Sequence, residues 1–362
     1  MKKIKRRRGT RKKMKINDFM NQISGWLKGS GPNADIVISS RIRLARNLFK
    51  IPFPHWAKKE DGEKVIRFVK EAFEKTEPLK DGLFLRLDQL DSVDKQFLVE
   101  RHLMSSEHAM RSNQKAVLIS PDENIAIMVN EEDHLRIQVM ESGFDLDGTW
   151  QVINTIDNCL SGLLPFAFKK EWGFLTACPT NTGTGMRGSV MLHLPALVMM
   201  RQINRVLEAI AKLSFATRGL YGEGTQAAGN FFQISNQVSL GQIEEEIIGN
   251  IKGVIKQIIE QEQKARDTML SEHKAMLEDR VWRSHGTLKS AHIISSNETI
   301  ELLSMLRLGS DLGIIKNIER SLINDLFILT QPAHLQKLEN KKLSANERDV
   351  KRAEIIRQRL EV

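Results

Sequence analysis

One segment of the chain, in which arginines alternate with apolar residues, constrains the fold more than any other. It reads DIVISSRIRLARNL over residues 35–48. The apolar residues that share one parity are Ile36, Ile38, Ile42 and Leu44. On a β-strand successive side chains point to opposite faces, so Arg41 and Arg43 are expected together on the other face. The segment therefore predicts a strand of a sheet with one apolar face and one face that carries arginines.

A second segment, residues 124–140, alternates twice and has Asn130 to Asp133 between its two apolar sets. We interpret it as a hairpin, or as one strand with a polar interruption. Glu132, His134 and Arg136 share the parity opposite to the second apolar set. These three side chains are therefore predicted to project together from the sheet.

The remaining patterns predict an α+β sheet domain followed by a helical domain. Helices are expected over 59–76 and 195–213, and a long amphipathic helix begins near Gln242. Residues 172–195 predict a strand, a glycine-rich loop and a second strand, and further strands are expected near 213–218 and 230–238. Beyond about 262 the pattern is almost wholly helical.

Composition and charge exclude several classes of protein. No apolar run approaches the ~20 residues that span a bilayer, and the two cysteines, Cys159 and Cys178, argue for a reducing cytosol. Residues 1–13 hold nine Lys and Arg and no acid, which accounts for the whole net charge of +9. We expect this leader to be disordered, as a solvated tail or as sequence upstream of a start at Met14. A nucleic-acid-binding arm is the alternative.

Glycines 183, 185 and 188 form a G-x-G-x-x-G pattern. A dinucleotide-binding fold requires this pattern to open a helix, but here the following residues, Val190, Leu192 and Leu194, alternate as a strand. The other motifs of a protein kinase and a Walker A motif are also missing from the sequence. The pattern is therefore interpreted as a loop whose backbone N–H groups could hold an anion, with Arg187 inside it.

Arginines and glutamates at these turns suggest two halves of one site. Converging arginines would neutralise a triphosphate and the charge of a transferring phosphoryl group. The candidates are Arg41, Arg43, Arg136, Arg187 and Arg218. Glu132 and Glu223 would be repelled by phosphate unless a cation lay between them. A guanidinium substrate is such a cation, and carboxylates could grip it and accept its proton.

Four motifs, SSRIRLARNL, NEEDHLRI, CPTNTGTGMRGSV and RGLYGEG, occur in that order and resemble the catalytic domain of the phosphagen (guanidino) kinases. The resemblance implies that the five arginines clamp the phosphates of ATP, with Mg²⁺ bound through the nucleotide rather than by protein side chains. It also implies that Glu132 and Glu223 hold and deprotonate the guanidinium, and that Cys178 lies beside it. The nucleotide-binding residues implied by the resemblance are Ser39, Ser40, Arg41, Ile42, Arg43, His102, Arg136, Arg187, Gly188, Ser189, Val190, Met191, Arg218, Gly219, Leu220, Tyr221 and Gly222.

Two departures from the small-substrate phosphagen kinases refine this prediction. The first motif begins at Ser39, which leaves no room for their all-helical N-terminal domain, and about a hundred residues follow the catalytic motifs. Both features resemble the bacterial protein arginine kinases, which act with the Clp protease system. We therefore expect a basic leader at 1–15, a catalytic domain at 16–260 and a helical domain at 261–362.

The helical extension contains RDVKRA at 348–353. Arg348 and Arg352 are four residues apart, so they share one helix face, beside Asp349. The pattern alone also fits a solvated charged face. The resemblance implies a phosphoarginine-sensing allosteric site at Arg348, Asp349, Arg352 and Ala353, and it implies dimerisation through this domain.

The expected function is ATP-dependent phosphorylation of arginine side chains in proteins, in the cytoplasm, marking them for Clp-type proteolysis during stress. The expected partners are protein substrates with exposed arginines, an activator protein, the Clp machinery and a second copy of the chain. No membrane partner is expected, and nucleic acid is not favoured. Two alternatives stay open: a phosphagen kinase acting on free arginine, and an inactive adaptor that binds phosphoarginine.

Overall fold

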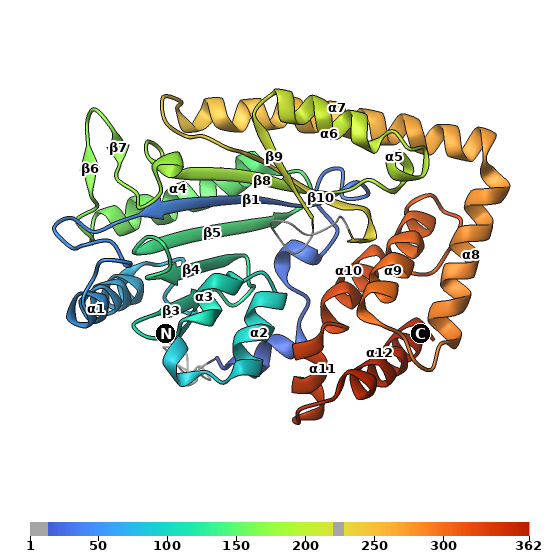
Figure 1. Ribbon diagram of the computed structural model, residues 1–362, viewed down its shortest axis with the longest axis horizontal. Helices are drawn as coiled ribbons and strands as arrows, with labels where there is room; N and C mark the ends of the chain where they lie inside the picture. The colour runs from blue at the N-terminus through green and yellow to red at the C-terminus, as the bar shows by residue number, and fades with distance from the viewer. Residues whose placement is uncertain (1–13, 220–227, 362) are drawn as a thin grey trace, which may run out of the picture.

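An eight-stranded antiparallel sheet forms the centre of the computed structural model, which describes residues 14–219 and 228–361 (Figure 1). Its strand order is β2-β3-β4-β5-β1-β8-β10-β9, and a separate hairpin, β6-β7, projects from one end. The strands are β1 (Val37–Arg46), β2 (Leu83–Arg86), β3 (Ala116–Ile119), β4 (Ile125–Val129), β5 (Leu135–Ser142), β6 (Phe168–Lys169), β7 (Gly173–Phe174), β8 (Met186–His193), β9 (Phe215–Arg218) and β10 (Phe231–Asn236). The predicted α+β class is confirmed.

The register of the sheet brings the five candidate arginines to one face. Arg43 of β1 lies opposite Arg187 of β8, and Arg136 of β5 lies opposite Ala45 of β1. Arg218 of β9 pairs with Gln233 of β10, which in turn pairs with Met191 of β8. Directly opposed residues in antiparallel strands point to the same face. The prediction that Arg41 and Arg43 share a face is thus confirmed, and three further strands add an arginine to it.

Helices cover the opposite, apolar face. It packs against α4 (Leu146–Ser161) and α7 (Glu244–Glu272), and Ile42 and Leu44 are fully buried there. At Gly188 an added Cβ would lie 2.6 Å from Cδ1 of Ile251 on α7. Glycine at this position allows α7 to approach β8 closely.

A second core limits the arginine face on one side. Over β2, β3 and β4 that face is buried against α2 (Ser92–Glu100), where Val117, Met128 and Phe97 belong to one apolar cluster. The arginine patch therefore lies over the other half of the sheet, between this core and the C-terminal helices. Two further helices, α1 (Lys59–Lys75) and α3 (Ser106–Met110), complete this part of the fold.

The chain after α7 is helical, as predicted, and packs beside the sheet (Figure 1). Its helices are α8 (Lys274–Ser290), α9 (Ser296–Asp311), α10 (Arg320–Leu329), α11 (Pro332–Glu339) and α12 (Ala345–Leu360). The expected domain boundary at 260/261 falls inside α7, a single continuous helix. The division into domains therefore stays a prediction.

One helix prediction is wrong in detail. Residues 195–213 form two helices, α5 (Pro195–Met199) and α6 (Ile203–Lys212), rather than one. The chain breaks at Arg201, whose φ of 56° lies in the left-handed region and cannot continue a helix. The helix expected over 59–76 and the hairpin expected over 124–140 are confirmed as α1 and as β4–β5.

Candidate active site

Repulsion among the clustered guanidinium groups and their burial both disfavour charge on this face of the sheet. Burial lowers the pKa of Arg41 to about 9, with further contributions from Arg136, Arg187 and Arg218. Burial and the neighbouring Arg218 and Arg136 lower the pKa of Arg187 to about 10. These shifts mean that the apo site holds positive charge at a cost in free energy. An anion with several charged oxygens would relieve that cost.

Arg43 carries buried hydrogen-bond donors that an anion could satisfy. Its Nε and Nη2 atoms are buried and have no hydrogen-bond partner among the described residues. Burial, followed by Arg41 and Arg136, lowers its pKa well below the ordinary value. A buried donor without an acceptor is unfavourable by about 1–3 kcal/mol. Phosphate oxygens would accept hydrogen bonds from these donors, so the site fits a nucleoside triphosphate.

Two other arginines are held in place by neutral side chains of the same face. Nη2 of Arg41 donates to Oε1 of Gln233 over 2.7 Å, and the guanidinium of Arg187 donates to Oγ of Ser235 over 3.1 Å. Neutral acceptors orient these guanidinium groups without cancelling their charge. Both arginines therefore remain available to an anion.

The acidic turn between β4 and β5 supplies the opposite charge. The side chain of Glu132 is exposed, yet partial desolvation, followed by Asp133, raises its pKa above the ordinary glutamate value. Glu131 instead lies 2.6 Å from Nη1 of Arg136 through Oε2. Burial alone would lower the pKa of Arg136, but Glu131 raises it. The two neighbouring carboxylates thus differ: Glu131 forms an ion pair with an arginine, and Glu132 forms no ion pair among the described residues.

Sequence reasoning missed Asp133, which joins the acidic turn to the cysteine loop. Its Oδ1 accepts from Nδ2 of Asn47 over 2.6 Å and from the backbone N–H of Ala177 over 2.7 Å. The next residue is Cys178, half-buried, whose Sγ lies 3.1 Å from Oγ1 of Thr180. Cys178 is also close enough to raise the pKa of Arg187 against the larger effects of burial and Arg218. The predicted cysteine therefore lies near the predicted arginine.

His134 does not project beside Glu132 and Arg136 as predicted. It belongs to the turn before β5, and its Nδ1 accepts from the backbone N–H of Leu48 over 3.0 Å. Nε2 lies 2.9 Å from the carbonyl oxygen of Pro52. Strand parity does not extend into the turn, and the buried imidazole links two segments of backbone instead.

Four of the predicted nucleotide-binding residues are oriented toward the apolar face of the sheet, away from the arginines. The register places Ser40, Ile42, Gly188 and Val190 there. The Ser40 hydroxyl donates to the carbonyl oxygen of Gly143 over 2.9 Å and is buried. These four side chains therefore do not reach the arginine face, and the role of the four residues in nucleotide binding stays a prediction. Gly219 is buried, and the predicted residues Leu220, Tyr221, Gly222 and Glu223 lie outside the described residues.

A pocket adjoins the arginines at Arg41. The predicted residues that line it are Ser39, Arg41, His102, Ser189 and Met191. His102 has a φ of 58° and packs edge-on against Trp26, with ring centroids 5.4 Å apart. Burial, followed by Arg41, lowers the pKa of His102 to about 4, so the imidazole is neutral at pH 7. A neutral ring and apolar walls suit an uncharged part of a ligand whose phosphates lie on the arginines.

The C-terminal RDVKRA motif lies on α12, in another part of the structure. Arg352 is 1% exposed, and its guanidinium donates to the carbonyl oxygens of Thr330 over 2.8 Å and Ile294 over 2.9 Å. It also pairs with Asp349 over 2.5 Å. Arg348 is half-buried, and Ala353 is buried beneath the helix. Arg352 therefore links α12 to the backbone at Thr330 and Ile294. Arg348 is the more accessible cation of the pair.

The comparisons with known proteins agree with this geometry. The model of the ATP:guanido phosphotransferase C-terminal catalytic domain matches residues 64–265. The model of the protein-arginine kinase McsB C-terminal domain matches residues 274–362. A protein-arginine kinase of Halothermothrix orenii is 49% identical over 96% of this chain and 99% of its own length.

The chain belongs to the protein-arginine kinase branch of the ATP:guanido phosphotransferases. It is an enzyme of the kinase class. A second protein-arginine kinase, from Desulforamulus reducens, is 49% identical over 94% of this chain and 96% of its own length.

Solved structures show the same fold. The duplicated taurocyamine kinase from Schistosoma mansoni with bound transition state analog components has a TM-score of 0.59 and 26% identity. The match covers 65% of this chain and 34% of that one. A lombricine kinase has a TM-score of 0.57 at 23% identity, covering 68% of this chain and 75% of that one.

Proposed function

We propose that this kinase transfers the γ-phosphoryl group of ATP to a guanidinium nitrogen of arginine side chains in proteins. The observation that carries the proposal is the opposition of two charges across one site. The arginine face, on which Arg43 has buried donors without an acceptor, lies near an acidic turn in which Glu132 makes no ion pair among the described residues. The names of the relatives support a protein as the acceptor.

In the proposed reaction, a guanidinium nitrogen of the substrate attacks the γ-phosphorus while the bond from that phosphorus to the β–γ bridging oxygen breaks. ADP leaves with the electron pair, and the nitrogen loses one proton. Glu132 is the described group proposed to accept this proton, since its pKa is raised above the ordinary glutamate value. Glu223 is proposed for the same task, on the family resemblance alone.

The arginine face would bind the nucleotide phosphates and stabilise the charge on the transferring phosphoryl group. No group of three or more His, Cys, Asp or Glu able to hold a metal occurs in the described parts of the chain. Mg²⁺ is therefore proposed to arrive with the nucleotide, coordinated by its phosphate oxygens. It would neutralise charge between the β- and γ-phosphates.

We further propose that Arg348 and Asp349 read phosphoarginine, as the family resemblance implies. The contacts of the neighbouring Arg352 support a route by which such binding would affect α10. Arg352 donates to the carbonyl of Thr330, which caps the C-terminal end of α10. A phosphoarginine that drew Asp349 or Arg352 into new contacts would change the restraint on that end of α10.

Clp-type targeting, a stress role, an activator protein, homodimerisation and a cytoplasmic location remain proposals from the resemblance. Two free cysteines, one of them exposed, are consistent with a reducing compartment. No helix in the described part of the chain is long and apolar enough to cross a membrane.

The test is to incubate the full-length chain with ATP and Mg²⁺, and with casein or free arginine. We expect acid-labile phosphate on casein, located on arginines by mass spectrometry. Casein whose arginines have been converted to citrulline is the matched control, because citrulline lacks the cationic acceptor. Phosphorylation of free arginine alone would show a phosphagen kinase, and no transfer to either acceptor would show an adaptor.

A further inference from the structure

A groove lies beside the acidic turn between β4 and β5. It encloses about 600 Å³, and its walls are the segment that leads into α1 and the loop between α3 and β3. Asn130 and Glu131 of the acidic turn line it as well. Burial and Asp133 raise the pKa of Glu132, and His55, which lines the groove, lies close enough to oppose them. The groove therefore borders the glutamate that is proposed to accept the substrate proton.

Asn130 connects the two walls of the groove. Its Nδ2 donates to the carbonyl oxygen of Gly62 on α1 over 3.0 Å and to that of Gln114, in the loop before β3, over 2.7 Å. Asn130 has a φ of 60°, a left-handed conformation that asparagine adopts more readily than most residues. Both walls are thus tied to one residue of the acidic turn, which gives the groove a defined shape.

Three cations line the groove without a carboxylate of their own. Lys58 and Arg111 are exposed, Lys115 is half-buried, and none of them forms an ion pair with a residue that the structure describes. Glu131 is the one carboxylate among the described lining residues, and it is already paired with Arg136. Burial lowers the pKa of Lys115, and Arg111 adds to this effect while Glu131 opposes it. An anion in the groove would relieve the repulsion between these cations.

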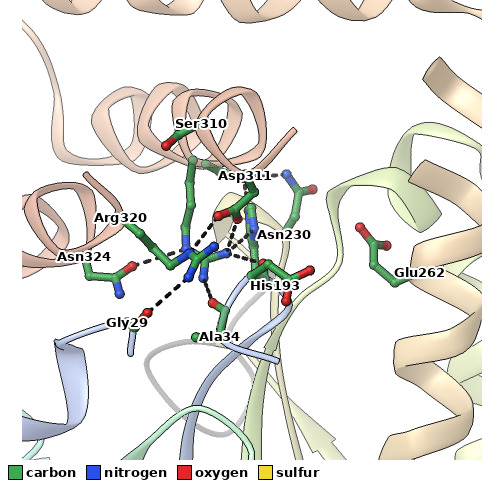
Figure 2. Close-up of polar contacts among 12 residues, drawn as sticks. Gly29, Ala34, His193, Asn230, Glu262, Ser310, Asp311, Arg320 and Asn324 are labelled. Atoms are coloured by element: carbon green, nitrogen blue, oxygen red, sulfur yellow. Dashed lines mark hydrogen bonds and ion pairs between the residues drawn. The ribbon is translucent and has the colours of Figure 1, made fainter. Parts of the chain in front are cut away.

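Buried cations elsewhere in the fold have partners within the chain, as the cluster between α9 and α10 shows (Figure 2). Oδ2 of Asp311 lies 3.2 Å from Nη1 of Arg307, and Oδ1 accepts from Nε of Arg320 over 2.7 Å. Arg307 also donates to Oδ1 of Asn324 over 3.2 Å. These guanidinium groups hold helices together. The groove cations have no such partner among the described residues and are open to a ligand.

Exposed apolar side chains beside these cations favour a polypeptide over a small anion as the occupant. Met110 lines the groove and is 81% exposed. Trp56 lies between the lining residues His55 and Ala57, is 73% exposed, and has its ring centroid 4.6 Å from that of His55. Methionine and aromatic residues are enriched where proteins bind one another, and scattered cations alone would not require them.

We propose that this groove binds acidic residues that flank the acceptor arginine in the substrate polypeptide. The proposal rests on the proposed phosphorylation of arginine side chains in proteins. An arginine held at Glu132 would place neighbouring residues of its chain in the groove, where Asp or Glu carboxylates would meet Lys58 and Arg111. The same cations would repel lysines and arginines beside the acceptor, so the groove would select against basic clusters.

The test compares two peptides that each contain one arginine. In the first, two glutamates stand on either side of the arginine, and in the second all of these glutamates are glutamines. Initial rates are measured on the full-length chain with ATP and Mg²⁺ as acid-labile phosphate. The acidic peptide should have a kcat/KM roughly tenfold higher at low salt. The two values should converge at high salt, because salt screens exposed charges.

Lys58→Gln combined with Arg111→Gln removes the two exposed cations of the groove. We expect the preference to shrink to about threefold or less, with the glutamine peptide reacting as in the wild type. Arg67→Gln combined with Lys70→Gln is the matched control, since both residues are exposed on α1 and neither lines the groove. It should keep the full preference. Lys58→Glu combined with Arg111→Glu should reverse the preference in favour of the glutamine peptide.

The proposal is overturned if the wild type reacts equally with both peptides, if the groove variant keeps the preference, or if the control loses it as well. Equal phosphorylation of both peptides would leave the proposed function standing. Anisotropy of the labelled acidic peptide, measured without ATP, reports binding independently of turnover. Binding that depends on Lys58 and Arg111, without phosphorylation of any peptide, would sink the proposed function and leave the groove an acidic-peptide site. Displacement of that peptide by a lower concentration of single-stranded RNA would overturn the proposal in favour of nucleic acid.

Discussion

Oε2 of Glu131 lies 2.6 Å from Nη1 of Arg136, and this ion pair separates the roles of two adjacent glutamates. Glu131 also accepts a hydrogen bond from the hydroxyl of Ser105, which fixes its carboxylate from the other side. Glu132, the next residue, is exposed on the acidic turn. Glu131 therefore orients Arg136, an arginine of the proposed phosphate site, and Glu132 is available to a substrate cation.

Glu132→Gln should reduce kcat by roughly 10²-fold or more while ADP affinity stays unchanged, because Glu132 would remove a proton from the guanidinium. Its pKa is raised, and only the carboxylate accepts a proton. The wild-type rate should therefore fall as pH drops through a value above the ordinary glutamate pKa, and this limb should vanish in the variant. Steady-state rates across pH test this. Near-wild-type turnover would remove Glu132 from the mechanism.

Glu131→Gln is expected to act mainly on the nucleotide. Without the ion pair, Arg136 loses the partner that orients it, so KM for ATP should rise more than kcat falls. The same steady-state assay gives both constants. A pure loss of kcat would show that Glu131 serves the acceptor rather than the phosphate site.

Arg187→Lys should rescue poorly, with kcat/KM close to that of Arg187→Ala, because an ammonium cannot make the planar two-point contact of a guanidinium. Arg187 lies opposite Arg43 at the centre of the patch and donates to Ser235. The expected loss is roughly 10²-fold or more. Full activity in the lysine variant would place Arg187 outside the phosphate site.

Arg43→Met should stabilise the nucleotide-free protein and abolish most of its stabilisation by ATP. The variant removes two buried donors that lack acceptors, and we expect the free energy of unfolding to rise by about 1–2 kcal/mol. Denaturant melts with and without ATP measure both effects. A less stable apo protein with an unchanged response to ATP would contradict the interpretation of Arg43 as a phosphate ligand.

Asp133→Ala should lower kcat without changing the affinity for ADP, since Asp133 positions the loop before Cys178. Asp133→Asn keeps an acceptor oxygen for Asn47 and Ala177, so it should restore most of the rate. Asp147→Ala, which breaks an exposed pair with Lys252, is the control and should be neutral. If the asparagine variant is as impaired as the alanine variant, the charge of Asp133 matters rather than its hydrogen bonds.

Arg348→Ala should remove activation by added phosphoarginine and keep the basal rate, whereas Arg352→Ala should also lower the melting temperature. Arg352 is buried and donates to Thr330 and Ile294, so its loss leaves carbonyls unsatisfied. Asp349→Ala is expected to lose activation as well. Initial rates against phosphoarginine decide this, and identical curves for wild type and Arg348→Ala would leave the motif an ordinary charged helix face.

Local patterns were sufficient for most of the elements and for gathering Arg41 and Arg43 on the face proposed to bind phosphate. Alternation predicted that Arg41 and Arg43 share a face, because side chains on a strand repeat with period two. It failed at His134, where the strand ends and the turn follows its own geometry. It also failed at Arg201, where a left-handed residue divides an apolar pattern that looked like one helix.

The sequence by itself predicted the two halves of the proposed chemistry, arginines for phosphate and glutamates for guanidinium, because residue types and strand parity carry that information. Only the tertiary structure decided which glutamate is paired with Arg136, because that depends on Ser105 and Arg136 approaching from different elements. It also decided that Phe327 and Ile328 lie beside Arg41. Nearly three hundred residues separate them, and a contact at that distance is made by packing, which no local pattern records.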